Sequence, residues 1–197
     1  MSTARRFGSL ALVLALAACA SDPAPDSSPA APAPPSPPPA ETESLAPDTL
    51  DVWTIETTRL EATADAPVIV RDARLAAHTN EGGFDRLVFE FDGGHPAVHV
   101  EYVDKPVRAC GSGDQLFPEG NGYLQIRLSG AQAHTDAGEA TIPHQRETHT
   151  LSTVVETVPT CDFEGEVTWV LGVRSPEPYR VIRLDAPARL AVDVRHP

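Results

Sequence analysis

The amino-acid sequence predicts an all-β protein: a single β-sandwich domain that follows a signal peptide and a disordered proline-rich tether. Three observations predict this class. Apolar and polar residues alternate with a period of two in many short segments, clusters of Gly, Pro, Asp and Asn separate those segments, and no segment shows a convincing amphipathic helical repeat. Many short strands at regular spacing are typical of a sandwich or an open barrel.

The expected strands follow one another from residue 68 to the C-terminus. In the segment GGFDRLVFEFDGGHP, Leu87, Phe89 and Phe91 point to one side and Arg86 to the other. Trp169 lies inside the mixed run EVTWVLGV and is expected in the core. One short helix is expected, near residues 136–139. The main strand segments are 68–77, 86–91, 98–103, 123–129, 167–173, 179–184 and 190–194.

The first nineteen residues predict export and lipidation. Arg5 and Arg6 precede the apolar run LALVLALAA, which is too short for a permanent transmembrane helix but suits a secretory signal. The sequence LAAC that ends at Cys19 resembles a bacterial lipobox, in which the cysteine thiol is acylated. The alternative is an ordinary signal peptide with a coincidental cysteine. We therefore expect a lipoprotein signal peptide over residues 1–18 and an extracytoplasmic protein of the cell envelope, anchored to the membrane through Cys19.

The next segment, residues 19–47, is expected to be a disordered tether. Its run PAPDSSPAAPAPPSPPPAETES cannot bury a core and favours extended, polyproline-like chain. At about 3.1 Å per residue it would hold a domain on the order of 70 Å from the lipid. Residues 48–197 are expected to form one domain.

The charge balance excludes one class of partner. The formal net charge is −13, and because residues 1–18 contain two arginines and no acid, the chain without them carries −15. Binding to nucleic acid requires a basic surface, so we expect no nucleic-acid partner. The acidity is also explained by solubility alone.

Two cysteines remain after lipidation, Cys110 and Cys161. An even pair in an exported protein predicts a disulfide, and closing a loop of this length stabilises a fold by about 4 kcal/mol in the chain-entropy model. The alternative is a pair of reactive thiols, although neither cysteine belongs to a C-x-x-C motif.

Asp85 and Arg86 leave two interpretations open. As neighbours on a strand they face opposite sides and cannot pair with each other. In the structural interpretation Asp85 caps the preceding turn and Arg86 makes a cross-strand ion pair, for example with a glutamate. In the functional one Arg86 donates hydrogen bonds to a carboxylate or sugar of a cell-wall fragment. Tyr102 and Tyr123 are the aromatic residues favoured for the same ligand surface, ahead of Trp53, Trp169 and Tyr179.

A loop rich in histidine and acid supports an alternative function. Imidazole and carboxylate side chains together bind zinc or transfer protons. In this alternative the protein is a small metal-assisted hydrolase that uses the loop 134–149 as its active site. The spacing matches no known ligand motif, however, so we predict no metal and no cofactor. The candidates for a metal site are His134, Asp136 and His144, with Glu139 and His149 nearby.

The order of motifs resembles the AMIN-like domain of bacterial lipoproteins. The resemblance runs from Trp53 to Arg195. It is carried by VRDARLAAH, GFDRLVFEFDG, the strand PAVHVEY, GYLQIRLSGAQAHTDAGEAT, CDFEGEVTWVLGV and PYRVIRLDAPARLAVDVR. The cysteine pair is an addition to this pattern.

The resemblance implies a β-sandwich and a non-catalytic function. AMIN domains are regarded as modules that bind the envelope, and the AMIN-like group has no catalytic residues to transfer to this chain. We therefore expect a lipid-anchored binding or scaffolding module, not an enzyme, whose partner is peptidoglycan or an envelope protein. Tight zinc binding that depends on His134 or His144 would favour the hydrolase instead.

Overall fold

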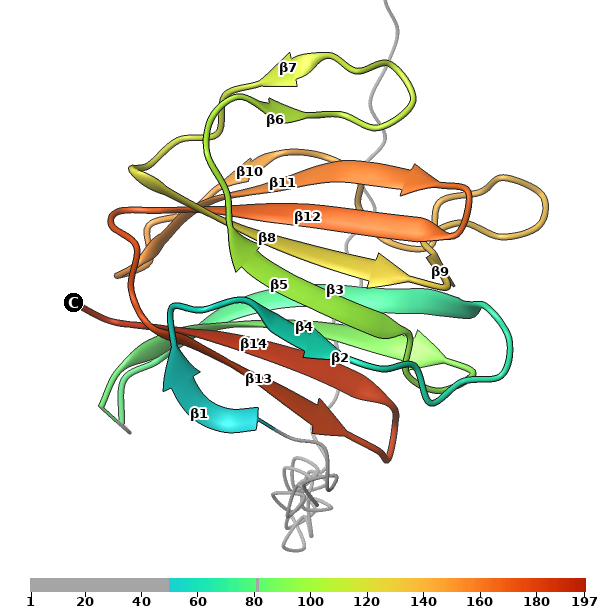
Figure 1. Ribbon diagram of the computed structural model, residues 1–197, viewed down its shortest axis with the longest axis horizontal. Helices are drawn as coiled ribbons and strands as arrows, with labels where there is room; N and C mark the ends of the chain where they lie inside the picture. Colours follow the sequence, from blue (N-terminus) through green and yellow to red (C-terminus); the bar gives the residue numbers. More distant parts are fainter. Residues whose placement is uncertain (1–49, 81) are drawn as a thin grey trace, which may run out of the picture. The chain divides into compact units, whose positions relative to one another are not determined.

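The computed structural model describes residues 50–80 and 82–197. The predicted signal peptide, Cys19 and the tether lie outside these residues. The described residues form two six-stranded sheets and a separate two-stranded hairpin (Figure 1). They contain no helix, so none long and apolar enough to cross a membrane is found among them. The helix expected near residues 136–139 is wrong: the chain makes a tight turn there, closed by a bridge between His134 and Ala140.

The first sheet, sheet A, is antiparallel except for its last pair. This sheet combines strands from both ends of the described chain. The C-terminal β13 pairs with the N-terminal β1, and the C-terminal β14 pairs with β4. In spatial order its strands are β1 (Leu50–Thr54), β13 (Tyr179–Leu184), β14 (Arg189–Arg195), β4 (Phe84–Asp92), β3 (Val68–His78) and β9 (Ala131–Gln132).

The second sheet, sheet B, is antiparallel throughout. Its strands in spatial order are β10 (Glu147–Thr148), β11 (Val154–Phe163), β12 (Glu166–Val173), β8 (Gly122–Ser129), β5 (Ala97–Tyr102) and β2 (Thr58–Leu60). The separate hairpin consists of β6 (Val107–Arg108) and β7 (Gln115–Leu116).

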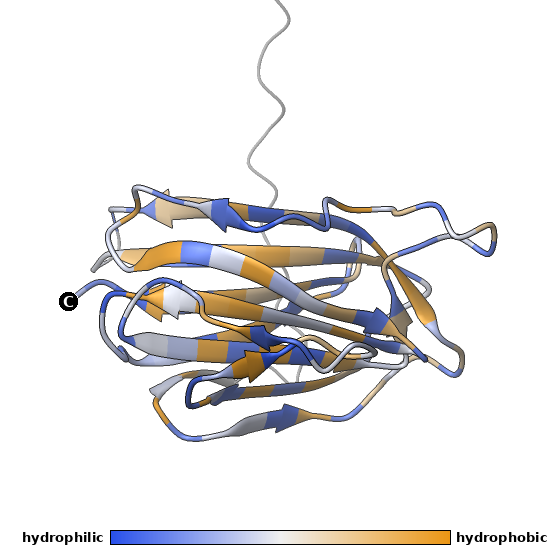
Figure 2. Ribbon diagram, turned by 90° about the horizontal axis from the view of Figure 1, so that it is seen from above, coloured by the Kyte–Doolittle hydropathy of each residue, from blue (hydrophilic) through white to orange (hydrophobic). Residues whose placement is uncertain are grey.

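The core lies between the two sheets and follows the alternation read from the sequence. Leu87, Phe89 and Phe91 point inward from β4, whereas Arg86 points outward. Trp169 is 5% exposed and meets the ring of Phe89 edge-on at 5.5 Å, so its expected place in the core is confirmed. Figure 2 shows apolar and polar residues alternating along the strands of both sheets. The sandwich class is therefore confirmed.

A disulfide and a small second core cover part of the outer face of sheet B. Cys110 and Cys161 are bonded, which confirms the predicted pair and ties the β6–β7 segment to β11. Val107 packs there on Tyr123 and Val170, the outward-pointing side chains of β8 and β12. The hairpin thus shields apolar groups that would otherwise face water.

Asp85 fastens the two sheets together at one end of the sandwich. Its carboxylate is fully buried and accepts hydrogen bonds from the backbone N–H groups of Thr153 (2.7 Å) and Val154 (2.9 Å). The ring of His196 contacts its other oxygen at 2.8 Å. The expectation that Asp85 caps the preceding turn is therefore wrong. The carboxylate is bound instead to β11, because β4 and β11 begin, and β14 ends, at the same end of the domain (Figure 1).

The glycine before β4 makes this closure possible. The backbone N–H of His196 donates to the carbonyl of Gly83 at 2.9 Å, and Gly83 has φ of 73°. A Cβ at this position would lie 2.5 Å from Nδ1 of His196. Only glycine adopts this backbone conformation without strain and leaves room for the imidazole.

Candidate functional site

The outer face of sheet A brings Arg86 against a buried carboxylate. Arg86 donates two hydrogen bonds to Asp193, from Nε to Oδ1 at 2.6 Å and from Nη2 to Oδ2 at 3.0 Å. Arg180 donates a third, from Nε to Oδ2 at 2.7 Å. The three residues are neighbours across β13, β14 and β4, and Asp193 is fully buried. The ion pair expected for Arg86 is confirmed, with aspartate as the partner instead of glutamate.

Each of these two guanidinium groups lies over the face of an aromatic ring. Arg86 lies 5.1 Å from the centroid of Phe84, and Arg180 lies 5.1 Å from Phe84 and 4.7 Å from Trp53. The two rings are 6.1 Å apart. Each such contact stabilises by about 0.5–2 kcal/mol, depending on how far the cation is removed from water. The rings and the ion pairs together fix the arginine side chains.

Arg195 completes the set, and it differs from the other two arginines. Its guanidinium lies 5.0 Å from the centroid of Trp53, and the side chain is exposed. It forms no ion pair with any acidic side chain in the part of the chain that the structure describes. We call the whole set the arginine–aromatic cluster: Trp53, Phe84, Arg86, Arg180, Asp193 and Arg195.

The charge of the cluster is opposite to that of the chain. It contains three guanidinium groups and one carboxylate, whereas the whole sequence carries −13. A planar guanidinium stacked on a ring keeps its N–H groups at its edge, where they donate to carboxylate or phosphate oxygens. Of these residues, sequence analysis proposed Arg86 for ligand binding and named Trp53 as a less favoured aromatic residue. The alternation in YRVIRL and RLAVDVR indicates outward positions for Arg180, Asp193 and Arg195. That these side chains lie next to Arg86 depends on the order of the strands, which the alternation does not give.

Tyr102 and Tyr123 are not part of this cluster. Both belong to sheet B, on β5 and β8. The hydroxyl of Tyr102 donates to the carbonyl of Glu177 at 2.6 Å, and burial raises the pKa of Tyr102 to about 12. The hydroxyl of Tyr123 donates to the carbonyl of Gly120 at 2.5 Å, and Lys105 covers its ring at 4.4 Å. Ligand binding by the two tyrosines stays a prediction, with their hydroxyl groups already bonded within the protein.

The histidine-rich loop is divided among separate contacts. Nδ1 of His134 lies 2.8 Å from Oδ2 of Asp162, and Nε2 of His149 lies 2.9 Å from the hydroxyl of Thr157. His144 and Asp136 are exposed. Among residues 50–80 and 82–197, no three His, Cys, Asp or Glu side chains are placed to hold one metal ion. The geometry therefore adds no support to the hydrolase alternative.

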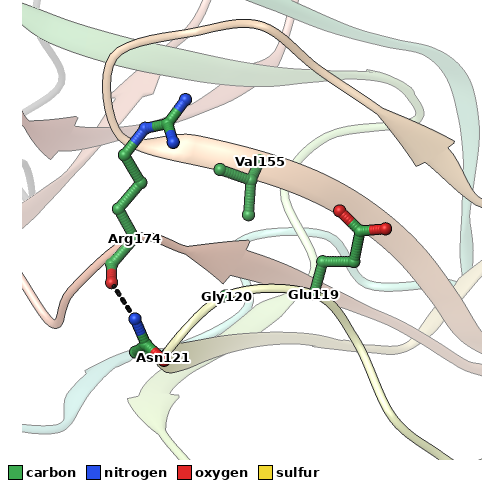
Figure 3. A pocket seen from close by; sticks show the side chains of 5 residues that line it. All are labelled: Glu119, Gly120, Asn121, Val155 and Arg174. Carbon is green, nitrogen blue, oxygen red and sulfur yellow. Dashed lines mark hydrogen bonds between the residues drawn. The ribbon is translucent and has the colours of Figure 1, made fainter.

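A shallow pocket of about 310 Å³ lies beside β11, and its asparagine and arginine side chains are bonded within the fold (Figure 3). The side-chain amide of Asn121 donates to the carbonyl of Arg174 at 2.9 Å. The guanidinium of Arg174 donates to the carbonyls of Ser152 and Leu151, each at 3.1 Å. Figure 3 shows Val155 between Arg174 and Glu119. These bonds hold loops together, and so the arginine–aromatic cluster is the stronger candidate for a ligand site.

A β-sandwich whose outer face exposes arginine beside aromatic rings has the features of a binding domain. The family model of the AMIN-like domain matches residues 68–196, well over half of the chain. The protein therefore belongs to the AMIN-like domain family, as the sequence motifs indicated. Domains of this family are generally non-enzymatic and occur in extracytoplasmic proteins of the cell envelope. No curated protein and no solved structure matches the chain.

Proposed function

We propose that this protein is a non-catalytic, lipid-anchored module that binds peptidoglycan in the bacterial envelope. Membership of the AMIN-like family over residues 68–196 carries the proposal. The arginine–aromatic cluster supports it, because it gives an acidic chain a local surface that attracts anionic polymers. An alternative partner on the same surface is an acidic envelope protein.

The anchor and the tether complete the proposed mechanism. Acylation of Cys19 would fix one end of the chain to the membrane, and residues 19–47 would let the domain reach material on the order of 70 Å away. Anchor and domain would thereby hold the wall and the membrane at a bounded distance. Replacing Cys19 by Ser should move the protein from the membrane to the soluble fraction, and labelled palmitate should no longer be incorporated.

Co-sedimentation with purified peptidoglycan tests the binding function. The chain from residue 19, carrying Cys19→Ser to keep it soluble, should pellet with peptidoglycan in a saturable manner. Binding should weaken as salt concentration rises, because screening reduces attraction between exposed charges. Metal analysis of the same sample checks the hydrolase alternative. Absence of saturable binding would contradict the proposal.

A further inference from the structure

We infer that the arginine–aromatic cluster is the ligand site and that Arg195 binds carboxylate groups of the peptidoglycan stem peptides. The inference rests on the proposed function and goes further by naming the residue, the surface and the chemical group. Arg195 ends β14 at the edge of the cluster, where its guanidinium lies on Trp53.

The first argument is the state of the Arg195 side chain. The guanidinium carbon lies over the indole ring of Trp53, 5.0 Å from the ring centroid. A guanidinium carries five N–H donors, and the aromatic ring satisfies none of them with an oxygen acceptor. Arg195 is exposed, and no acidic side chain of the described residues pairs with it. These donors are therefore available to an anion from solution.

The second argument is that the cluster already binds a carboxylate in this way. Arg86 lies over the ring of Phe84 and donates two hydrogen bonds, of 2.6 and 3.0 Å, to the Asp193 carboxylate. Arg195 on Trp53 repeats the placement of a guanidinium over a ring, but Arg195 is exposed and no acidic side chain of the described residues binds it. A planar carboxylate fits the edge of a guanidinium with two parallel hydrogen bonds. Asp193, which is fully buried, fixes Arg86 and Arg180 and is not itself displaced.

The third argument is charge complementarity. An acidic chain and the carboxylate-rich stem peptides of peptidoglycan repel each other on average, so contact requires a local excess of positive charge. Several other arginines of the sandwich surface are neutralised by a neighbouring acid, as in the pairs of Arg71 with Asp92 and of Arg74 with Asp72. Arg195, which pairs with no acidic side chain of the described residues, supplies positive charge for this contact.

Substitution of Arg195 tests the inference directly. Binding to peptidoglycan is measured by co-sedimentation of the chain from residue 19 with Cys19→Ser. Because a charge-assisted bidentate pair is lost, Arg195→Ala should weaken binding by about tenfold or more. Arg195→Lys keeps the charge but loses the planar fork, so it should bind measurably less well than the wild type. Arg195 is exposed, and both variants should fold normally.

Arg59 offers a matched control. It is an exposed arginine that points outward from β2 of sheet B, whereas the strands of the cluster belong to sheet A. Arg59→Ala changes the net charge by the same amount and should leave the affinity within about twofold, because a distant exposed charge is largely screened. Equal weakening by Arg59→Ala and Arg195→Ala would reduce the effect to net charge and overturn the inference.

Chemical treatment of the peptidoglycan identifies the anion. Amidation of its carboxyl groups should abolish the Arg195-dependent part of binding. Removal of attached phosphate polymers with hydrofluoric acid should leave that part unchanged. Arg195-dependent binding that survives amidation, or that disappears with the phosphate polymers, would overturn the assignment to carboxylates.

A small probe separates failure of this inference from failure of the proposed function. The peptide acetyl-Lys-D-Ala-D-Ala presents a free carboxylate without the polymer. It should shift the indole N–H resonance of Trp53 in the wild type and not in Arg195→Ala, while the resonance of the buried Trp169 stays in place. If the peptide shifts Trp53 and peptidoglycan does not pellet the protein, the proposed function fails and the site stands. If peptidoglycan binds the wild type and Arg195→Ala equally, the function stands and the site is wrong.

Discussion

The two sides of the β4–β14 strand pair each bury a carboxylate, and they do so in different ways. Asp85 and Asp193 both have no exposed surface. Asp85 points between the sheets, where the backbone N–H groups of Thr153 and Val154, at the start of β11, and the ring of His196 surround it. Asp193 points outward, where Arg86 and Arg180 bind it. The inner carboxylate is bonded mainly to main chain and the outer one to side chains.

The two carboxylates therefore hold different parts of the protein: Asp85 holds strands together, and Asp193 holds side chains at the surface. Backbone donors cannot move without moving a strand, so Asp85 fixes the start of β11 and the C-terminal segment against β4. Guanidinium donors belong to long side chains, and Asp193 therefore fixes only where those side chains lie. The inner face is specialised for stability, whereas the outer face keeps cationic side chains in place at the surface.

The largest expected effect is on the inner side. Asp85→Asn removes the charge. Its amide oxygen can still accept from the N–H groups of Thr153 and Val154, which share one oxygen in the wild type, but these bonds lose their charge assistance, and an NH₂ group replaces the oxygen that faces His196. We expect the free energy of unfolding to fall by about 3 kcal/mol, because breaking a buried charged interaction costs this much. Urea denaturation followed by circular dichroism measures the change.

Asp92→Asn provides the control on the same strand. Asp92 is 63% exposed and pairs with exposed Arg71. Its replacement should cost less than about 1 kcal/mol, as is usual for a surface ion pair. If both substitutions cost the same, Asp85 does not fasten the sheets in the way the hydrogen bonds indicate.

A smaller effect is expected on the outer side. Asp193→Asn weakens the contacts to Arg86 and Arg180, but their side chains are 16% exposed and gain some hydration in return. We expect a loss of about 1–2 kcal/mol in the free energy of unfolding, below the loss for Asp85→Asn. The same denaturation experiment decides this order. A loss equal to that of Asp85→Asn would show that the outer carboxylate is as important for folding as the inner one.

Much of this arrangement could be predicted from local sequence. The alternation in FDRLVFEFD fixed which residues of β4 face the core, and it placed Arg86 outside. The two cysteines that remain in an exported chain predicted the bond between Cys110 and Cys161. Each of these inferences depends on a period of two or on simple counting, both of which are visible without knowing the strand order.

The partners across the sheets could not be predicted in the same way. Asp85 binds Thr153 from a distance of 68 residues in the chain, and Arg86 binds Asp193 from 107 residues away. Such contacts follow from which strands pair and in what register, and the alternation of one strand contains neither. Trp53 was noted as an aromatic residue, but its place on Arg195 depends on the pairing of β1 with β13.

The smallest expected effect concerns the other end of β4, where His95 is buried beside the ring of Phe91. Nε2 of His95 lies 3.0 Å from Oδ1 of Asp185, while its Nδ1 has no hydrogen-bond partner among the described residues. Burial lowers the pKa of His95 below 6.5, and nearby Arg183 acts in the same direction against the raising effect of Asp185. Unlike the two backbone hydrogen bonds of Asp85, the contact of His95 with Asp185 does not offset the cost of placing a charge in the interior.

The pH dependence of stability follows from that lowered pKa. Above pH 6.5 His95 is neutral in both the folded and the unfolded chain, and its full contribution to stability is present. As the pH falls below this value the unfolded chain binds the proton first, so stability decreases until the folded-state pKa is passed. The urea midpoint of the wild type should therefore fall between about pH 7 and pH 5, and His95→Gln should reduce that fall. His144→Gln, which removes an exposed histidine, should leave the fall unchanged; a wild-type slope in His95→Gln would contradict the assignment.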